Sequence, residues 1–117
     1  MTGDDTGVRL VLVTTPDRET AESLARTLVE ERLAACGNVV PGLRSIFRWE
    51  GEVQAEDEAL LLLKTRVEHV ERVGRRVAEL HPYDVPEVVA LPVCAGLGAY
   101  LDWVRFETRA EPGVADG

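Results

Sequence analysis

The 117-residue sequence has no long apolar run, and this absence limits where the protein can reside. No window approaches the roughly 18 consecutive apolar residues that a transmembrane helix needs. Residues 1–7 also lack the basic and apolar regions of a signal peptide. We therefore expect a cytoplasmic protein that has no membrane partner. The two cysteines, Cys36 and Cys94, are then expected to be reduced thiols, and they form no CxxC zinc motif.

Basic residues are scarce relative to acidic ones. The chain has 13 lysines and arginines against 21 acidic residues, which gives a formal net charge of −8 and a pI of about 4.7. Such a surface repels phosphate backbones and anionic lipids, so we expect no nucleic-acid partner. Lys64 is the sole lysine. Genomic composition explains this bias, although a lone lysine also suits a site that needs a compact ammonium group.

The motifs of several enzyme classes are absent from the sequence. There is no P-loop, no GxGxxG, no HExxH and no Ser-His-Asp arrangement. No nucleophile has an evident base beside it in the sequence. We therefore expect no catalytic residue and no enzymatic activity.

What is present is a series of strand-like and helix-like segments. Their apolar periodicity predicts strands at 8–13, 39–49, 52–65 and 87–93, and helices from 14–17 to a stop at 37–38, at 67–80 and at 97–106. Pro41-Gly42 predicts a bend or bulge, and Glu50-Gly51 predicts a hairpin turn.

This order, β-α-β-β-α-β followed by a helix, is the split βαβ arrangement of the ferredoxin-like α+β fold. We expect an antiparallel sheet with helices on one face. The expected organisation is a single domain over 8–107, a disordered N-terminal arm at 1–7 and a disordered C-terminal tail at 108–117.

Both faces of the expected sheet require burial. The segments 10–13, 60–63 and 88–91 are apolar at successive positions, whereas a sheet with one wet face alternates apolar and polar residues. The chain has no further element for the second face, and each exposed Leu or Val forfeits roughly 1.5–3 kcal/mol. We therefore expect self-association through this face, with the edge of the long hairpin joining a neighbour's sheet.

Several short segments, in this order, resemble those of the CutA family of divalent-cation-tolerance proteins. They are Thr14-Thr-Pro-Asp17, Arg32-Leu-Ala-Ala-Cys-Gly-Asn38, Phe47-Arg-Trp-Glu-Gly-Glu52, Leu63-Lys-Thr65, His81-Pro-Tyr-Asp-Val-Pro-Glu87, Leu91-Pro92 and Tyr100-Leu-Asp-Trp103. The resemblance covers about residues 8–106. It implies a ferredoxin-like fold, a compact homotrimer, a cytoplasmic location and a link to tolerance of copper and other divalent metals.

The resemblance also implies a metal site at His81, because family members that bind copper use the histidine at this position. Asp84 and Glu87 follow in a loop stiffened by prolines, which can hold carboxylates near the imidazole. Cys36 is a further candidate ligand. The alternatives are that His81 only caps the preceding helix and that Cys36 is a small core residue.

The sequence departs from the copper-binding members at two positions. Leu80 stands where some members have a second histidine, and Val13 stands where some have a cysteine. Since two soft ligands are missing, we expect weak, reversible binding of a divalent metal, with ligands contributed by two subunits. Copper is the first candidate for this metal.

The resemblance also implies a second site, which lies between subunits of the trimer. Family members have a polar cleft there, and its residues match Lys64, Trp49, Tyr83 and Glu87. A cleft with a cation, carboxylates and aromatic rings can hold a small anionic ligand. Trp49 and Tyr83 can equally serve as interface residues. His69, between two glutamates on the 67–80 helix, is expected to face solvent.

Three functions remain open from the sequence. The first is a homotrimer that takes part in copper and divalent-metal tolerance. The second is a signalling or small-molecule-binding trimer of the PII type, although no phosphate-cradling glycine loop or basic cluster is present. The third is a structural trimer that anchors other proteins.

Overall fold

The computed structural model describes residues 5–110. The elements are β1 (Val8–Thr15), α1 (Arg18–Glu30), β2 (Cys36–Trp49), β3 (Glu52–Arg66), the 3-10 turn η1 (Val67–His69), α2 (Val70–Leu80), β4 (Val88–Pro92) and α3 (Gly98–Glu107). This order confirms the expected α+β fold with a split βαβ arrangement. Most of the expected terminal arm and tail, 1–4 and 111–117, lies outside the described residues. No helix in residues 5–110 combines the length and apolar character needed to cross a membrane.

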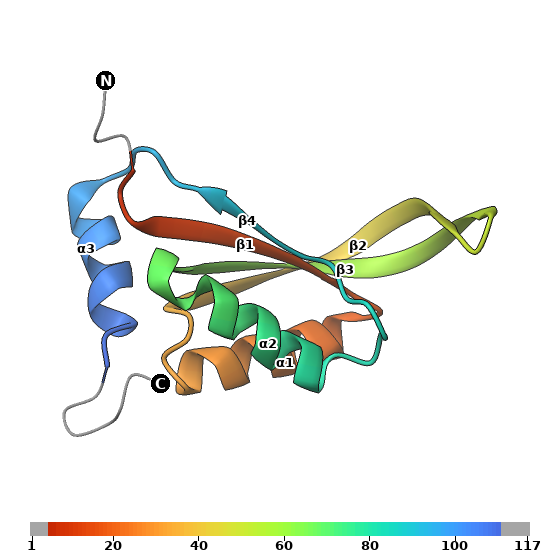
Figure 1. Cartoon of the computed structure of the whole chain (residues 1–117), viewed down its shortest axis with the longest axis horizontal. Coiled ribbons are helices and arrows are strands. Elements are labelled where there is room, and N and C mark those ends of the chain that lie inside the picture. The colour runs from red at the N-terminus through yellow and green to blue at the C-terminus, as the bar shows by residue number, and fades with distance from the viewer. Residues whose placement is uncertain (1–4, 111–117) are drawn as a thin grey trace.

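The four strands form one antiparallel sheet in the order β2-β3-β1-β4. The β2–β3 hairpin is the longest pair, and it projects well beyond the ends of β1 and β4 (Figure 1). A register shift between Val40 and Leu43 confirms the bulge expected at Pro41-Gly42. Glu50 and Gly51 both have positive φ, 51° and 83°, as a tight hairpin turn requires.

Helices α1 and α2 cover one face of the sheet (Figure 1). The side chains of β1 and β3 that point to this face are completely buried, and they pack with the apolar faces of both helices. These residues include Val11, Val13, Leu61 and Leu63, all at 0 % exposure. The alternate residues therefore point to the other face.

The other face, which we call the open face, is apolar and mostly uncovered. Strand alternation places Leu10, Leu12, Leu60 and Leu62 there, together with residues of the edge strands β2 and β4. Val40, Val89 and Leu91 on these edges are 44 %, 47 % and 47 % exposed. Helix α3 covers only one end of this face, where Leu101 and Val104 bury Val8. The expectation of an apolar second face that is left uncovered is confirmed for residues 5–110 of a single subunit.

Helix α1 ends earlier than the sequence predicts. It stops at Glu30, and the N–H groups of Leu33 and Ala34 both bond to the carbonyl of Leu28. Gly37, which we interpreted as the helix stop, lies inside β2 instead. A Cβ atom on Gly37 would lie 2.8 Å from the Cβ of Ala25, so glycine is needed there because α1 passes close to the strand.

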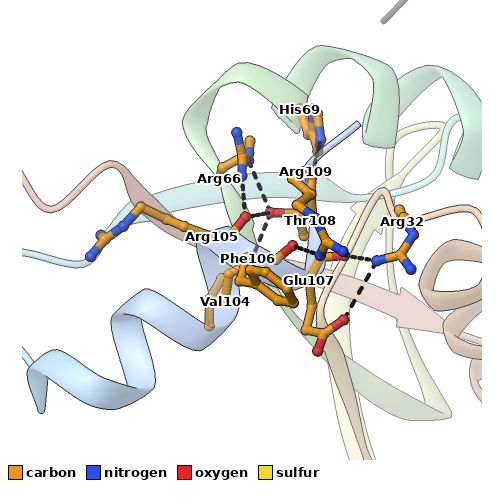
Figure 2. Close-up of polar contacts among 9 residues, drawn as sticks. All are labelled: Arg32, Arg66, His69, Val104, Arg105, Phe106, Glu107, Thr108 and Arg109. Carbon is orange, nitrogen blue, oxygen red and sulfur yellow. Dashed lines mark hydrogen bonds and ion pairs between the residues drawn. The ribbon is translucent and has the colours of Figure 1, made fainter. Parts of the chain in front are cut away.

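The C-terminus of α3 is held by side chains, most of them from distant parts of the chain (Figure 2). Four successive carbonyls accept from side-chain donors: Arg105 from Arg66, Phe106 from Arg109, Glu107 from Arg32, and Thr108 from His69. Helix C-termini leave such carbonyls without a partner inside the helix, and cationic donors also suit the helix dipole. We call these donors the α3 clamp.

Two expectations near the α3 clamp need correction. His69 does not face solvent: it is 4 % exposed, and its Nε2 atom lies 2.6 Å from the carbonyl of Thr108. The residue belongs to the 3-10 turn η1, whose geometry rotates its side chain away from the solvent-facing side of α2. Thr108 is fully buried and donates to the carbonyl of Val104, so the packed structure continues one residue beyond the expected boundary.

Candidate functional site

His81 terminates α2 and points into the fold. Pro82 disfavours helix in the preceding residue, and His81 accordingly has extended dihedrals, with φ −81° and ψ 141°. Its backbone N–H still donates to the carbonyl of Val77 over 2.8 Å. The side chain is only 7 % exposed. The interpretation of His81 as the residue that closes α2 is therefore correct in geometry.

Both ring nitrogens of His81 have backbone partners. Nε2 donates to the carbonyl of Thr14 over 2.7 Å, and Nδ1 accepts from the N–H of Tyr83 over 3.1 Å. A carbonyl can only accept and an N–H can only donate, so these contacts define a neutral ring with its proton on Nε2. A metal ion needs an imidazole lone pair, and the single lone pair of this ring is already used.

The expected metal ligands do not form a metal centre within the described chain. Among residues 5–110 there is no group of three His, Cys, Asp or Glu side chains placed to hold one ion. Asp84 and Glu87 are exposed and follow His81 in the loop before β4. Structural sites for transition metals usually supply four ligands, so the observed arrangement does not fit a closed site.

Cys36 lies far from His81 in the same subunit. Cys36 pairs with Lys64, which in turn pairs with Leu10, whereas His81 contacts Thr14. Leu10 and Thr14 are four residues apart on β1, which is about 13 Å along a strand. Cys36 is partly exposed at the start of β2, so neither the helix position nor the core burial expected for it is observed. Cys94 is exposed.

A large cleft lies between the β2–β3 hairpin and the loop that follows His81. Its volume is about 700 Å³. We call it the hairpin cleft, and it is lined by Thr14, Ser45, Ile46, Phe47, Trp49, Gln54, Glu56, Glu58, Pro82, Tyr83, Asp84, Val85 and Glu87. A cleft of this size with aromatic walls and a few polar groups is typical of a small-molecule site.

Tyr83 joins the two walls of the hairpin cleft. Its hydroxyl donates to Oε2 of Glu58 over 2.8 Å, and its ring lies 4.7 Å from the ring of His81. Burial, followed by the hydrogen bond to the Glu58 carboxylate, raises the pKa of Tyr83 to about 12. The phenol therefore remains a neutral donor at physiological pH, and it fixes the loop against β3.

The structure brings together three of the four residues expected in an inter-subunit cleft. Trp49, Tyr83 and Glu87 all line the hairpin cleft, but Lys64 of the same chain does not. Lys64 lies six residues along β3 from Glu58, which is about 20 Å. Its Nζ atom instead contacts Oδ1 of Asn38.

Comparison with known proteins identifies the family. Residues 9–107 match the family model described as CutA1 divalent ion tolerance protein. The chain belongs to the CutA1 family. The divalent-cation tolerance protein CutA of Thermus thermophilus is 54 % identical over 99 residues, a match that covers 85 % of this chain and 96 % of that protein. The chloroplastic protein CutA of Arabidopsis thaliana is 48 % identical over 100 residues.

Solved CutA1 structures have the same fold. The Thermus thermophilus protein has a TM-score of 0.85 at 53 % identity, covering 87 % of this chain and 99 % of that one. The Oryza sativa CutA1 has a TM-score of 0.87 at 42 % identity, and the match covers 92 % of this chain and 99 % of that one. The match covers only 55 % of the Arabidopsis protein and 58 % of the human protein CutA, so this chain spans little more than half of those relatives.

Most of the residues that line the hairpin cleft in this CutA1 chain were not expected from the sequence. Glu56, Glu58 and Phe47 line it, and none was among the expected site residues. A signal was present in β3, where polar residues occupy every second position, Gln54, Glu56 and Glu58, up to the apolar run that begins at Ala59. This alternation places them on one side of the strand, but the sequence does not show that the loop after His81 lies opposite.

Proposed function

We propose that this CutA1 chain acts in divalent-metal tolerance as a cytoplasmic homotrimer that binds metal weakly and reversibly. The observation that carries this proposal is the family match, which spans residues 9–107 and includes a relative that is named for divalent-cation tolerance. The cytoplasmic location is the one that the family resemblance implies, and Cys36 and Cys94 are not paired with each other in the structure.

The open face supports self-association. It leaves apolar side chains of all four strands partly exposed, and α3 covers only one end of it. On the reverse side of the hairpin tip, Ile46 and Val53 are also 72 % and 64 % exposed. Burying such groups is worth roughly 1.5–3 kcal/mol each, so association of several copies is strongly favoured. We propose three copies because the family resemblance implies a trimer.

The geometry of His81 supports weak rather than tight metal binding. A metal can reach Nδ1 only if the ring gives up the hydrogen bond from the Tyr83 N–H, while Nε2 keeps its proton on the Thr14 carbonyl. Leaving that N–H without a partner costs about 1–3 kcal/mol, which weakens affinity by roughly ten- to hundredfold. The other proposed ligands are Asp84, Glu87 and Cys36, contributed by one or two subunits. Copper is the divalent metal that such a mixed set of ligands prefers.

Calorimetric titration of the metal-free protein with Cu²⁺ and Zn²⁺ tests this proposal. We expect saturable binding with Kd in the micromolar range or weaker, and a clear loss in Asp84→Asn/Glu87→Gln and in His81→Gln. Glu22→Gln is the matched control, because it removes an exposed carboxylate on α1 that forms a surface ion pair with Arg18. Equal heats in all four proteins would reject the site, and the absence of saturable binding would reject metal binding itself.

The hairpin cleft favours a second candidate, a trimer that binds a small molecule. The cleft is large, and aromatic and polar side chains converge on it from two separate elements. In this candidate the trimer is a PII-like signalling module, and ligand occupancy is the signal. A thermal-shift screen of charged metabolites tests it, since a ligand of the folded state raises the unfolding temperature in proportion to its occupancy.

A further inference from the structure

We propose that the hairpin cleft binds a linear organic cation, an aliphatic diamine or polyamine. This inference rests on the small-molecule function proposed for the cleft and specifies its ligand class. The resemblance led us to expect an anionic ligand, because a lysine was expected in the cleft. The lining that a single chain contributes has the opposite charge.

Acidic groups line the cleft on both sides. Glu56 and Glu58 come from β3, and Asp84 and Glu87 come from the loop before β4. None of the lining residues within the described chain is basic. The two arginines of β2, Arg44 and Arg48, lie on the other strand face by alternation. They contact Asp57 and the carbonyl of Gly51, respectively.

The spacing of these carboxylates suits an extended cation better than a metal ion. Glu56 and Glu58 are two residues apart on one face of β3, which separates their α-carbons by about 6.7 Å. No three of these carboxylates converge on one point, since residues 5–110 contain no group of three metal-binding side chains. A chain with about four methylene groups between two ammonium groups spans a separation of this order.

Aromatic rings supply the apolar part of the site. Phe47 and Trp49 lie on the same strand face as Glu56 and Glu58, as the hairpin register shows. Their side chains are 36 % and 49 % exposed and line the cleft. Ring faces attract alkylammonium groups and also cover methylene chains. Tyr83 holds one carboxylate oxygen of Glu58 and leaves its other lone pairs available to an ammonium donor.

The test is calorimetric titration of the intact protein, in its own oligomeric state, with 1,4-diaminobutane and with spermidine. Butane-1,4-diol is the matched neutral probe, and n-butylamine is the probe with one charge. We expect both amines with multiple charges to bind, n-butylamine to bind about tenfold more weakly and the diol not to bind. Glu56→Gln/Asp84→Asn and Trp49→Ala are each expected to weaken diamine binding about tenfold, whereas Glu22→Gln on α1 leaves it unchanged.

Three outcomes would overturn the inference in different ways. Equal weakening by Glu22→Gln would show that the diamine only samples the net negative charge of the protein. Binding of a metabolite carboxylate or phosphate instead, abolished by Lys64→Ala, would show that Lys64 of another copy reaches the cleft, and it would reject the cationic ligand. If neither cations nor anions bind to the wild-type protein, the small-molecule function itself fails together with this inference.

Discussion

Removal of one donor from the α3 clamp should destabilise the protein measurably. Arg66 donates to the hydroxyl of Thr108 over 2.9 Å and to the carbonyl of Arg105 (Figure 2). Arg66→Met keeps most of the aliphatic stem and removes both hydrogen bonds. Hydrogen bonds from charged groups contribute about 1.5–3 kcal/mol, and the residue is only partly buried, so we expect a loss of about 2 kcal/mol.

Urea unfolding followed by far-UV circular dichroism measures this loss. The protein concentration must be constant, because assembly changes apparent stability by mass action. Arg75→Met is the matched control. It breaks an ion pair to Glu71 over 3.2 Å in which the side chains are 62 % and 89 % exposed, and such pairs contribute about 0–1 kcal/mol.

Hydrogen exchange adds a local measurement, since opening of the clamp should accelerate exchange of the α3 amides before those of β1 and β3. The reasoning would be refuted if Arg66→Met and Arg75→Met unfolded at the same urea concentration. It would also be refuted if the α3 amides kept their wild-type protection in Arg66→Met.

Three further predictions concern the cleft wall and the open face. His81→Phe removes the partners of the Thr14 carbonyl and the Tyr83 N–H, so it should lower the free energy of unfolding by about 3 kcal/mol, measured by thermal unfolding. A loss below about 1 kcal/mol would contradict the hydrogen bonds described for the ring. Tyr83 loses its proton near pH 10 in the unfolded chain but near pH 12 in the folded one. Its contribution to the free energy of unfolding is therefore present below pH 10 and is lost as pH rises toward 12. Unfolding measured across this range should show a steeper decline for wild type than for Tyr83→Phe, and parallel curves would reject the shift. Leu62→Asp places a charge on the open face and should yield monomers in sedimentation, whereas an unchanged mass would exclude that face from the interface.

The fold was largely predictable from the sequence because its elements are encoded locally. Apolar periodicity, the proline after His81 and the turn residues at Glu50-Gly51 are signals contained within a few neighbouring residues. The failure at Gly37 has a tertiary cause, because the reason for that glycine is the close approach of α1 at Ala25. The prediction that His69 faces solvent was wrong for a similar reason, since its partner Thr108 lies 39 residues away.

The candidate site was less predictable, because it depends on which segments meet in space. The sequence suggested His81, Asp84, Glu87 and Cys36 as one ligand set, but the sheet register separates Cys36 from the others within a subunit. The use of both ring nitrogens by backbone groups also has no sequence signal. The grouping of Tyr83 with Glu58 likewise depends on how the loop packs against β3.

The molecular mass of the wild-type assembly decides whether other copies of the chain cover the open face. The proposed function depends on an open face that other copies cover and on sites that lie between copies. Sedimentation equilibrium at micromolar concentration should give three times the 12.9 kDa of the chain, without dissociation on moderate dilution. A mass of one chain under the same conditions would contradict the account, since the apolar open face would then be stable in water without a partner.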